Sequence, residues 1–404
     1  MNGGSVMKKL IIIVVLSLFG LLFIAAIPAS STYINPVKIS AIVGIQSLLP
    51  DKNYQKEFNV KPGGTLTIDL RTGGSISIEG WNKDVVSADV IVKGRDSEEI
   101  VVEFEQNGNN VEINSYYGGN DDSYHSNAKL VVKIPNNYNV ELNTMGGEVK
   151  IYNVNGKMSG RTMGGGLDLK NLKGNLDLTT MGGEVTVRDC EVNGKVHTMG
   201  GDVIIENVTG DLNAKTMGGK VKQVNVKSSS GSTGSEVNIS TMGGPIEVDR
   251  ALNGAKVKTM GGEITVNYAE KFVDAETMGG DIEIKSVDGA IRAKTMGGDI
   301  EAKMIGDPSK GDRSVSLNSM GGDITLTVPA GLSMDIEIEI AFTKNYEGDV
   351  KIESDFKLNE EISKEWIKSK GSARKYLKGK ASIGDGKHKI RINTINGNVY
   401  LKKG

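Results

Sequence analysis

Carboxylates recur at one fixed position of the sequence, three residues after the methionine in seven of ten repeated Met-Gly-Gly motifs. A row of carboxylates could bind Ca²⁺, because this cation prefers oxygen ligands. Calcium-binding nonapeptide repeats are the nearest pattern, since two nonapeptides make an 18-residue unit. Those repeats need two Gly-Gly-x-Gly-x-Asp loops per coil, whereas each unit of this chain has one Gly-Gly pair and no Gly-Gly-x-Gly-x-Asp loop. The default interpretation is a turn preference for Gly-Gly-Asp/Glu, with calcium sites as the alternative. The acidic positions are Glu148, Glu184, Asp202, Glu263, Asp281, Asp299 and Asp323.

The methionines form a second column with possible chemistry. If the side chains alternate through the turn, the thioethers face outward as a hydrophobic docking face or a soft-metal surface. If the chain bends there, they fill a corner of the core, because Met adapts to irregular gaps. We favour the core position and expect the column to be at least partly buried. The column consists of Met145, Met163, Met181, Met199, Met217, Met242, Met260, Met278, Met296 and Met320.

A hydroxyl precedes each of these methionines, from Thr in nine copies and from Ser319 in the tenth. An ice- or glycan-binding surface would need exposed Thr in paired columns, but the residue after each Met is Gly. Alternation points this column inward, where stacked hydroxyls could bond to one another and to turn amides. We therefore expect a structural role.

The remaining reactive residues predict neither an enzyme nor a bound cofactor or metal. Cys190, the only cysteine, occupies a column that holds Val154, Leu172, Val208, Val226 and Val287 in other copies, which is typical of a small core residue. The three histidines are far apart in sequence, and His197 falls in a polar column. No metal-ligand spacing, nucleophile motif or phosphate loop is present. The net charge of −2 gives no basic surface for nucleic acid.

The repeat must be positioned by β-strands, because its columns alternate between apolar and polar. Most motifs are 18 residues apart, position +4 from Met is always Val, Leu or Ile, and position +6 is apolar except at Gln223. Period-2 alternation is the pattern of a strand. A lone unit cannot bury its apolar face, but coils stacked about 4.8 Å apart can. We predict an all-β fold, a single-stranded β-solenoid of about ten 18-residue coils over residues 141–327. The inserts at Ser228–Ser235 and Gly306–Asp312 should be loops at one corner.

The flanks of the repeat predict an exported chain with irregular ends. Residues 1–31 combine Lys8 and Lys9 with an apolar run and small residues, which indicates a signal peptide or an N-terminal membrane anchor. Cleavage after Ser31 is favoured, and contact with a membrane is expected only through this segment if it is uncleaved. Residues 56–140 should form an N-terminal β cap. Residues 328–404 should form a C-terminal β cap with a short helical insert around Trp366.

The order of these motifs resembles the exported putative-adhesin family, a bacterial domain of unknown function with β-strand repeats. Residues 294–300 are similar to its Thr-x-Ser-Gly-Asp-Ile pattern, with Gly in place of Ser. The entry over Val132–Gly147 and the ending over Ser354–Leu358, Gly384–Gly386 and Ile390–Leu401 are similar too. The resemblance covers about residues 56–403. It implies a secreted or surface β-helix-like fold and supplies no catalytic residues.

We therefore expect an exported, non-catalytic structural or adhesive repeat protein on the cell surface, in the periplasm or secreted. Its partners would be an extracellular polymer, a cell surface or an envelope component. A polysaccharide-active β-helix enzyme is the main alternative, and an envelope-stress accessory protein is another. Such an enzyme would need a local, non-repeating cluster of Asp, Lys and Arg on one face, whereas the polar columns of this sequence repeat.

Overall fold

A computed structural model describes residues 52–119, 125–227, 236–368 and 371–404 of this chain. The predicted signal peptide or anchor (residues 1–31) and the insert Ser228–Ser235 lie outside the described residues. The described part is all-β, as predicted, and contains two 3₁₀ turns but no α-helix: η1 (Ser97–Glu99) and η3 (Lys344–Tyr346). Among these residues, no helix has both the length and the apolar character that a membrane crossing requires.

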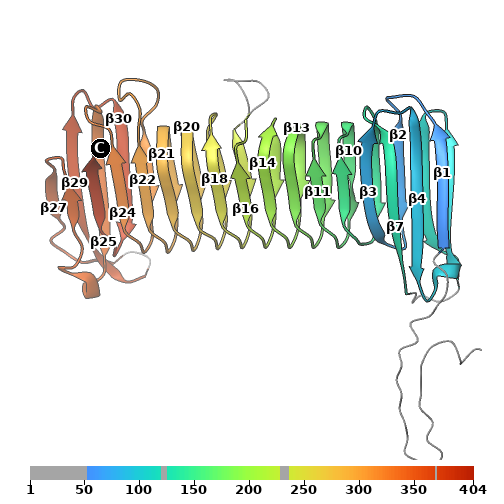
Figure 1. Ribbon diagram of the computed structural model, residues 1–404. Helices are drawn as coiled ribbons and strands as arrows, with labels where there is room; N and C mark the ends of the chain where they lie inside the picture. Colours follow the sequence, from blue (N-terminus) through green and yellow to red (C-terminus); the bar gives the residue numbers. More distant parts are fainter. Residues whose placement is uncertain (1–51, 120–124, 228–235, 369–370) are drawn as a thin grey trace, which may run out of the picture. The chain divides into compact units, whose positions relative to one another are not determined.

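The repeat segment forms parallel strands in which each residue pairs with the residue one repeat later. Val149 pairs with Leu167 and Leu167 with Val185, while Met158 pairs with Leu176 on the other side of the coil. The strands lie one behind another along a common axis (Figure 1). Their bounds are β9 (Val149–Tyr152), β10 (Asn155–Thr162), β11 (Leu167–Lys170), β12 (Lys173–Thr180), β13 (Val185–His197), β14 (Val203–Thr209), β15 (Leu212–Lys215), β16 (Val221–Val224), β17 (Val237–Ser240), β18 (Ile246–Ala251), β19 (Ala255–Lys258), β20 (Ile264–Glu276), β21 (Ile282–Lys294), β22 (Ile300–Met304), β23 (Val315–Asn318) and β24 (Ile324–Val328).

The core is a continuous column of aliphatic side chains enclosed by the stacked coils. Alternate residues of each strand are buried, as in β11, where Leu167 and Leu169 are inside and Asp168 and Lys170 are outside. Burial of one apolar face along every strand fixes the register, because a slip of one residue would turn all these side chains outward.

An asparagine column, which the sequence reasoning missed, forms the turn between the two strands of the early coils. Asn153, Asn171, Asn207 and Asn225 have φ between 50° and 61°, a left-handed conformation that Asn tolerates better than most residues. The side-chain amide of Asn171 donates to Asn153 Oδ1 at 3.1 Å, and that of Asn225 donates to Asn207 Oδ1 at 2.8 Å. These contacts join neighbouring coils at this corner.

The N-terminal segment extends the stack of parallel coils by one coil, and antiparallel strands close this end of the stack. β2 pairs in parallel with β8, and β3 with β9, so the two strands form a coil beside the first repeat. β4 and β1 then add antiparallel strands, and β5 and β6 form a hairpin. The bounds are β1 (Lys52–Asn59), β2 (Thr65–Leu70), β3 (Gly74–Trp81), β4 (Val85–Gly94), β5 (Ile100–Asn107), β6 (Asn110–Tyr117), β7 (Ser126–Pro135) and β8 (Asn139–Thr144).

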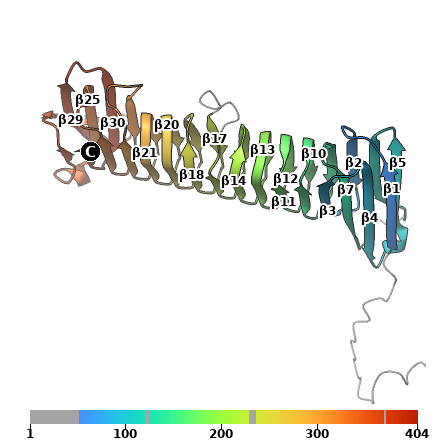
Figure 2. The ribbon, with the colours of Figure 1, turned by 45° about the horizontal axis from the view of Figure 1, so that its top comes forward.

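The C-terminal segment returns onto the last repeat. β30 pairs in parallel with β23, and β31 with β24, and β25 and β29 then add further strands, β29 antiparallel to β25 (Figure 2). The solenoid-like stack is therefore extended at both ends and interrupted by inserts, and it is not a uniform set of ten coils. The bounds are β25 (Met334–Phe342), β26 (Ile352–Ser354), β27 (Asn359–Ile362), β28 (Ile367–Lys368), β29 (Ala373–Ile383), β30 (His388–Ile395) and β31 (Val399–Lys403).

The prediction of a short helix around Trp366 is wrong, because the described residues on either side of Trp366 form the strands β27 and β28. Both strands pair with β29, and the Trp366 ring packs edge-on against Phe342 with the ring centres 6.0 Å apart. The basic composition of this stretch is compatible with an edge strand, where charged side chains discourage further pairing.

Candidate functional site

The hydroxyl column of the repeat is buried at the corner where each coil turns. Every member, including the additional Thr394, is at most 4% exposed. The Thr259 hydroxyl donates to the carbonyl of Gly244 in the preceding coil at 3.0 Å and accepts the N–H of Gly262 in its own coil at 3.2 Å. The predicted inward position is confirmed, and the partners that the structure records are glycine backbone groups rather than other hydroxyls.

The two glycines of each motif have different roles. A Cβ added to the second glycine, as at Gly262, would lie 2.1 Å from the carbonyl oxygen of Gly244. Real Cβ atoms do not approach backbone so closely, and therefore coil stacking requires glycine there. A Cβ on the first glycine, as at Gly261, would meet its nearest heavy atom at 3.5 Å, which is an ordinary contact. Coil stacking alone does not require the first glycine.

The methionines of the motif point away from the core. Nine of the ten are 37–61% exposed, and Met181 is partly buried. The prediction that these methionines fill a corner of the core is therefore wrong, because their side chains lie on the surface and are only partly covered there. By contrast, Met158, Met304 and Met334 elsewhere in the chain are at most 2% exposed. The alternation of side chains continues from the buried Thr through the turn, and this continuation directs the next residue outward.

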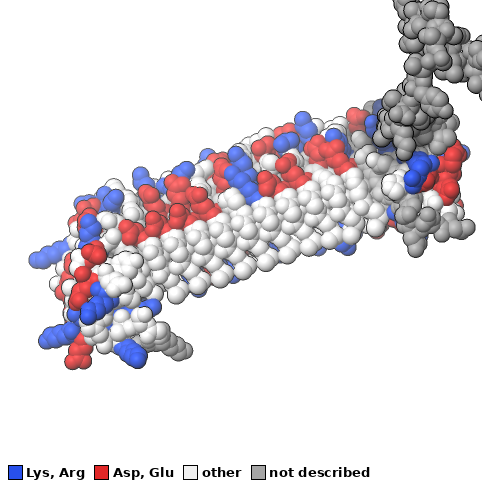
Figure 3. Space-filling view, turned by 90° about the horizontal axis from the view of Figure 1, so that it is seen from below, with Lys and Arg blue, Asp and Glu red and all other residues white. Residues whose placement is uncertain are grey.

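The methionines and first glycines together make a surface that we call the Met-Gly strip. The amide of Met260 donates to the carbonyl of Met242 at 3.2 Å, and the amide of Met278 donates to that of Met260 at 3.2 Å, so the column is stacked coil on coil. Figure 3 shows a long face free of charged side chains, with a row of charged side chains along its upper edge. The strip consists of the ten methionines and Gly146, Gly164, Gly182, Gly200, Gly218, Gly243, Gly261, Gly279, Gly297 and Gly321.

In the acidic column beside the strip, the aspartate side chains accept hydrogen bonds from backbone amides of the next coil. Asp281 Oδ1 accepts the N–H of Asp299 at 2.8 Å, and Asp299 Oδ1 accepts that of Asp323 at 2.7 Å. Asp202 and Asp323 accept the N–H of Lys220 and Asn398 in the same way. The glutamates instead make local contacts, such as the ion pair of Glu148 with Lys150 at 2.9 Å. Each aspartate therefore links its coil to the next one.

Cys190 and His388 are both buried, at separate places in the fold. Cys190 is buried in the core as predicted, and burial raises the pKa of its thiol to about 11, so that it stays protonated at neutral pH. His388 is also buried, and its Nδ1 accepts the N–H of Arg313 at 3.3 Å. Desolvation lowers the pKa of His388 and favours its neutral form. Within the described ranges, no group of three or more His, Cys, Asp or Glu side chains is placed to hold a metal ion.

Arg313 was missed by sequence reasoning and anchors the insert Gly306–Asp312. Its buried guanidinium donates to the carbonyls of Ile305 at 2.8 Å and Lys310 at 2.9 Å, and it forms an ion pair with Asp288. A single arginine at the end of an insert gives no periodic signal, so the sequence offered no means of finding it.

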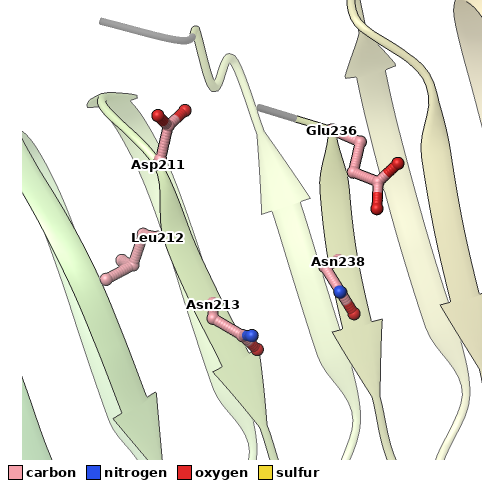
Figure 4. Close-up of a pocket in the computed structure, with 5 residues that line it drawn as sticks. All are labelled: Asp211, Leu212, Asn213, Glu236 and Asn238. Carbon is pink, nitrogen blue, oxygen red and sulfur yellow. The ribbon is translucent and has the colours of Figure 1, made fainter. Parts of the chain in front are cut away.

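A polar hollow of about 470 Å³ opens where β15 and β17 separate (Figure 4). The two strands pair only through Ala214 with Ile239 and Lys215 with Ser240. Glu236 in this hollow is already paired with Lys256 at 2.8 Å. Nearby, Gln223 is buried in an otherwise apolar column, and its Oε1 has no hydrogen-bond partner among the described residues. The hollow is lined by Asp211, Leu212, Asn213, Glu236 and Asn238.

Comparison with solved structures finds similar chains at low sequence identity. A putative cell adhesion protein from Clostridium sporogenes is 9% identical, with 88% of this chain and 100% of that chain covered and a TM-score of 0.18. A putative lipid binding protein from Parabacteroides distasonis is 16% identical, with 68% and 96% covered and a TM-score of 0.28. A putative adhesin from the same organism is 10% identical, with 87% and 97% covered and a TM-score of 0.24. With scores this low, the function must be argued from the residues of this chain.

No curated protein matches the sequence. A family model described as Toastrack DUF4097 matches residues 51–223 and again residues 218–402. These two matches cover nearly all of the described residues. The chain belongs to the Toastrack DUF4097 family.

Proposed function

We propose that this chain is an exported, non-catalytic structural or adhesive protein of the cell envelope, and that the Met-Gly strip is its main binding face. In this proposal, ten Thr/Ser-Met-Gly-Gly coils form a β-solenoid between β caps and present the strip as one extended surface. The partner would be an envelope component or an extracellular polymer. The observation that carries the proposal is the row of nine exposed methionines on a strip without charge.

A long exposed apolar surface marks an interaction site, because burying it against a partner removes apolar area from water. Met suits such a surface, since its flexible and polarizable side chain adapts to different partners. The first glycine of each motif adds to this argument. Coil stacking would tolerate a side chain there, yet all ten copies keep glycine, and a partner backbone or polymer can thus approach closely beside the methionines.

Repetition supports a binding role more than a catalytic one. Each coil presents the same Met and Gly groups, whereas catalysis needs a local set of groups with distinct roles. The aspartates beside the strip link the coils through backbone amides. Two reactive residues that the sequence offers, Cys190 and His388, are buried.

Three polar substitutions on the strip test this function. We expect Met260→Gln, Met278→Gln and Met296→Gln together to weaken binding of the purified chain to whole cells of its source by about tenfold, which corresponds to about 1.4 kcal/mol. Glutamine keeps the length of the side chain but places an amide where the partner would cover the thioether. Binding is measured by pull-down of labelled protein over a concentration series.

The matched control carries Thr265→Gln, Thr325→Gln and Thr327→Gln, three uncharged outward positions away from the strip. This control should bind as the parent chain does, and both variants should melt at nearly the same temperature as the parent. Unchanged binding of the methionine variant would contradict the proposed role of the strip. Cleavage of any glycan in a broad panel, abolished by one point substitution, would contradict a non-catalytic function.

A further inference from the structure

A row of charged and hydroxyl side chains crosses one face near the C-terminal end. Strand pairing places the outward residues Lys256, Asp274, Arg292, Ser316 and Arg391 in one row across β19, β20, β21, β23 and β30. A hollow of about 400 Å³ lies over this row. The row and the hollow together bring Asp, Lys and Arg side chains to one open surface.

Small side chains create the hollow. Ala290 lies in β21, Ser314 immediately precedes β23, and Ser316 lies within β23, so small side chains leave a depression between larger neighbours. Phe272 pairs with Ala290 from the adjacent strand and forms one wall, with its ring only partly buried. An aromatic wall beside serine hydroxyls can pack against the C–H face of a sugar and bond to its hydroxyl groups.

The residues that line the hollow carry a net positive charge, although the whole chain carries −2. Lys256, Arg292, Lys389 and Arg391 line it together with one acid, Asp274. Arg292 is 70% exposed and contacts Asp274 at 3.7 Å, a loose surface pair of little energy. Lys389 is exposed and makes no ion pair within the described part of the chain. Lys256 is paired with Glu236 and Arg391 with Glu337, so Arg292 and Lys389 are the cations accessible to an anionic ligand.

We propose that this hollow binds a carboxylate-bearing sugar unit of an acidic polysaccharide. The guanidinium of Arg292 matches a carboxylate in bidentate geometry, and Lys389 adds a further cation. Phe272 contacts the apolar face of the ring, while Ser314 and Ser316 face its hydroxyls. The site is separate from the Met-Gly strip and stands whether or not the strip binds a partner.

The test is calorimetric titration of the purified chain with a galacturonate hexamer. We expect saturable binding, weakened at least about tenfold by Arg292→Ser. The matched control is Lys195→Ser, which removes one cation from the same position of an earlier coil, where Lys195 is 63% exposed and pairs with Asp177 at 3.2 Å. The control should bind within about twofold of the parent chain, as expected for a distant charge screened by salt.

Two further titrations separate sugar recognition from simple attraction between charges. A neutral cellulose hexamer should not bind, and poly-glutamate should bind much more weakly than the galacturonate hexamer. Phe272→Leu should weaken galacturonate binding severalfold and leave the poly-glutamate titration unchanged. Absence of galacturonate binding, equal loss in Arg292→Ser and Lys195→Ser, or equal affinity for poly-glutamate would each overturn the proposal. If the methionine variant lost binding to cells but kept galacturonate binding, the result would support separate roles for the strip and the hollow.

Discussion

Gly262→Ala will destabilise the coil stack by about 3 kcal/mol or more, whereas Gly261→Ala, one residue earlier, will change stability little. The Cβ that this substitution adds to Gly262 would lie 2.1 Å from the Gly244 carbonyl oxygen, and this oxygen belongs to the backbone of the neighbouring coil. Relief would require the coils to separate, with loss of the parallel hydrogen bonds between them. At Gly261 the nearest atom to an added Cβ is 3.5 Å away.

The measurement is thermal unfolding of both variants, together with hydrogen exchange along the chain. In a repeat protein each coil contacts only its neighbours, so faster exchange should centre on the coils around Gly262. Gly261→Ala serves as the matched control, because it adds the same methyl group to the same turn. Equal melting temperatures for the two variants would contradict the assigned roles of the two glycines.

Thr277→Val will destabilise the protein by about 1–3 kcal/mol, the second largest effect that we expect. The Thr277 hydroxyl donates to the Gly262 carbonyl at 2.9 Å and accepts the Gly280 N–H at 3.3 Å. Valine keeps the shape of the side chain but leaves both backbone groups without this partner inside the corner. Urea unfolding of the parent and the variant measures the difference.

Thr277→Ser provides the control for this prediction. Serine already occupies the column at Ser319, where its hydroxyl makes the corresponding bonds to Gly298 at 2.9 Å and Gly322 at 2.9 Å. Thr277→Ser should therefore keep most of the stability that Thr277→Val loses. A Thr277→Val variant as stable as the parent chain, or more stable than Thr277→Ser, would contradict the assigned role of the hydroxyl.

The sequence predicted the all-β fold, the 18-residue register and the inward Thr column, because alternation within a strand is visible in one dimension. It could not decide the direction of Met260, since alternation is reliable only while the strand stays straight and the motif is a turn. Nor could it separate Gly261 from Gly262, because the difference depends on how closely the preceding coil approaches.

The hollow near Arg292 was beyond sequence reasoning for a different reason. Arg391 lies far beyond Arg292 in the chain and joins it only because β30 returns onto β23. The aspartate contacts have a similar origin. Asp281 can accept the N–H of Asp299 only when neighbouring coils are in register, so the sequence indicated a turn preference without showing what the carboxylate bonds to.

Methionine oxidation tests the central claim most directly, namely that each repeat turns Thr and the second Gly inward and presents Met and the first Gly outside. Under mild peroxide, peptide mass spectrometry should show rapid oxidation of the nine exposed strip methionines and slow oxidation of Met158, Met304 and Met334, which are buried in the same molecule. In urea all of these methionines should react at one rate. Protection of the strip methionines to the level of Met158 in the folded chain would contradict this arrangement.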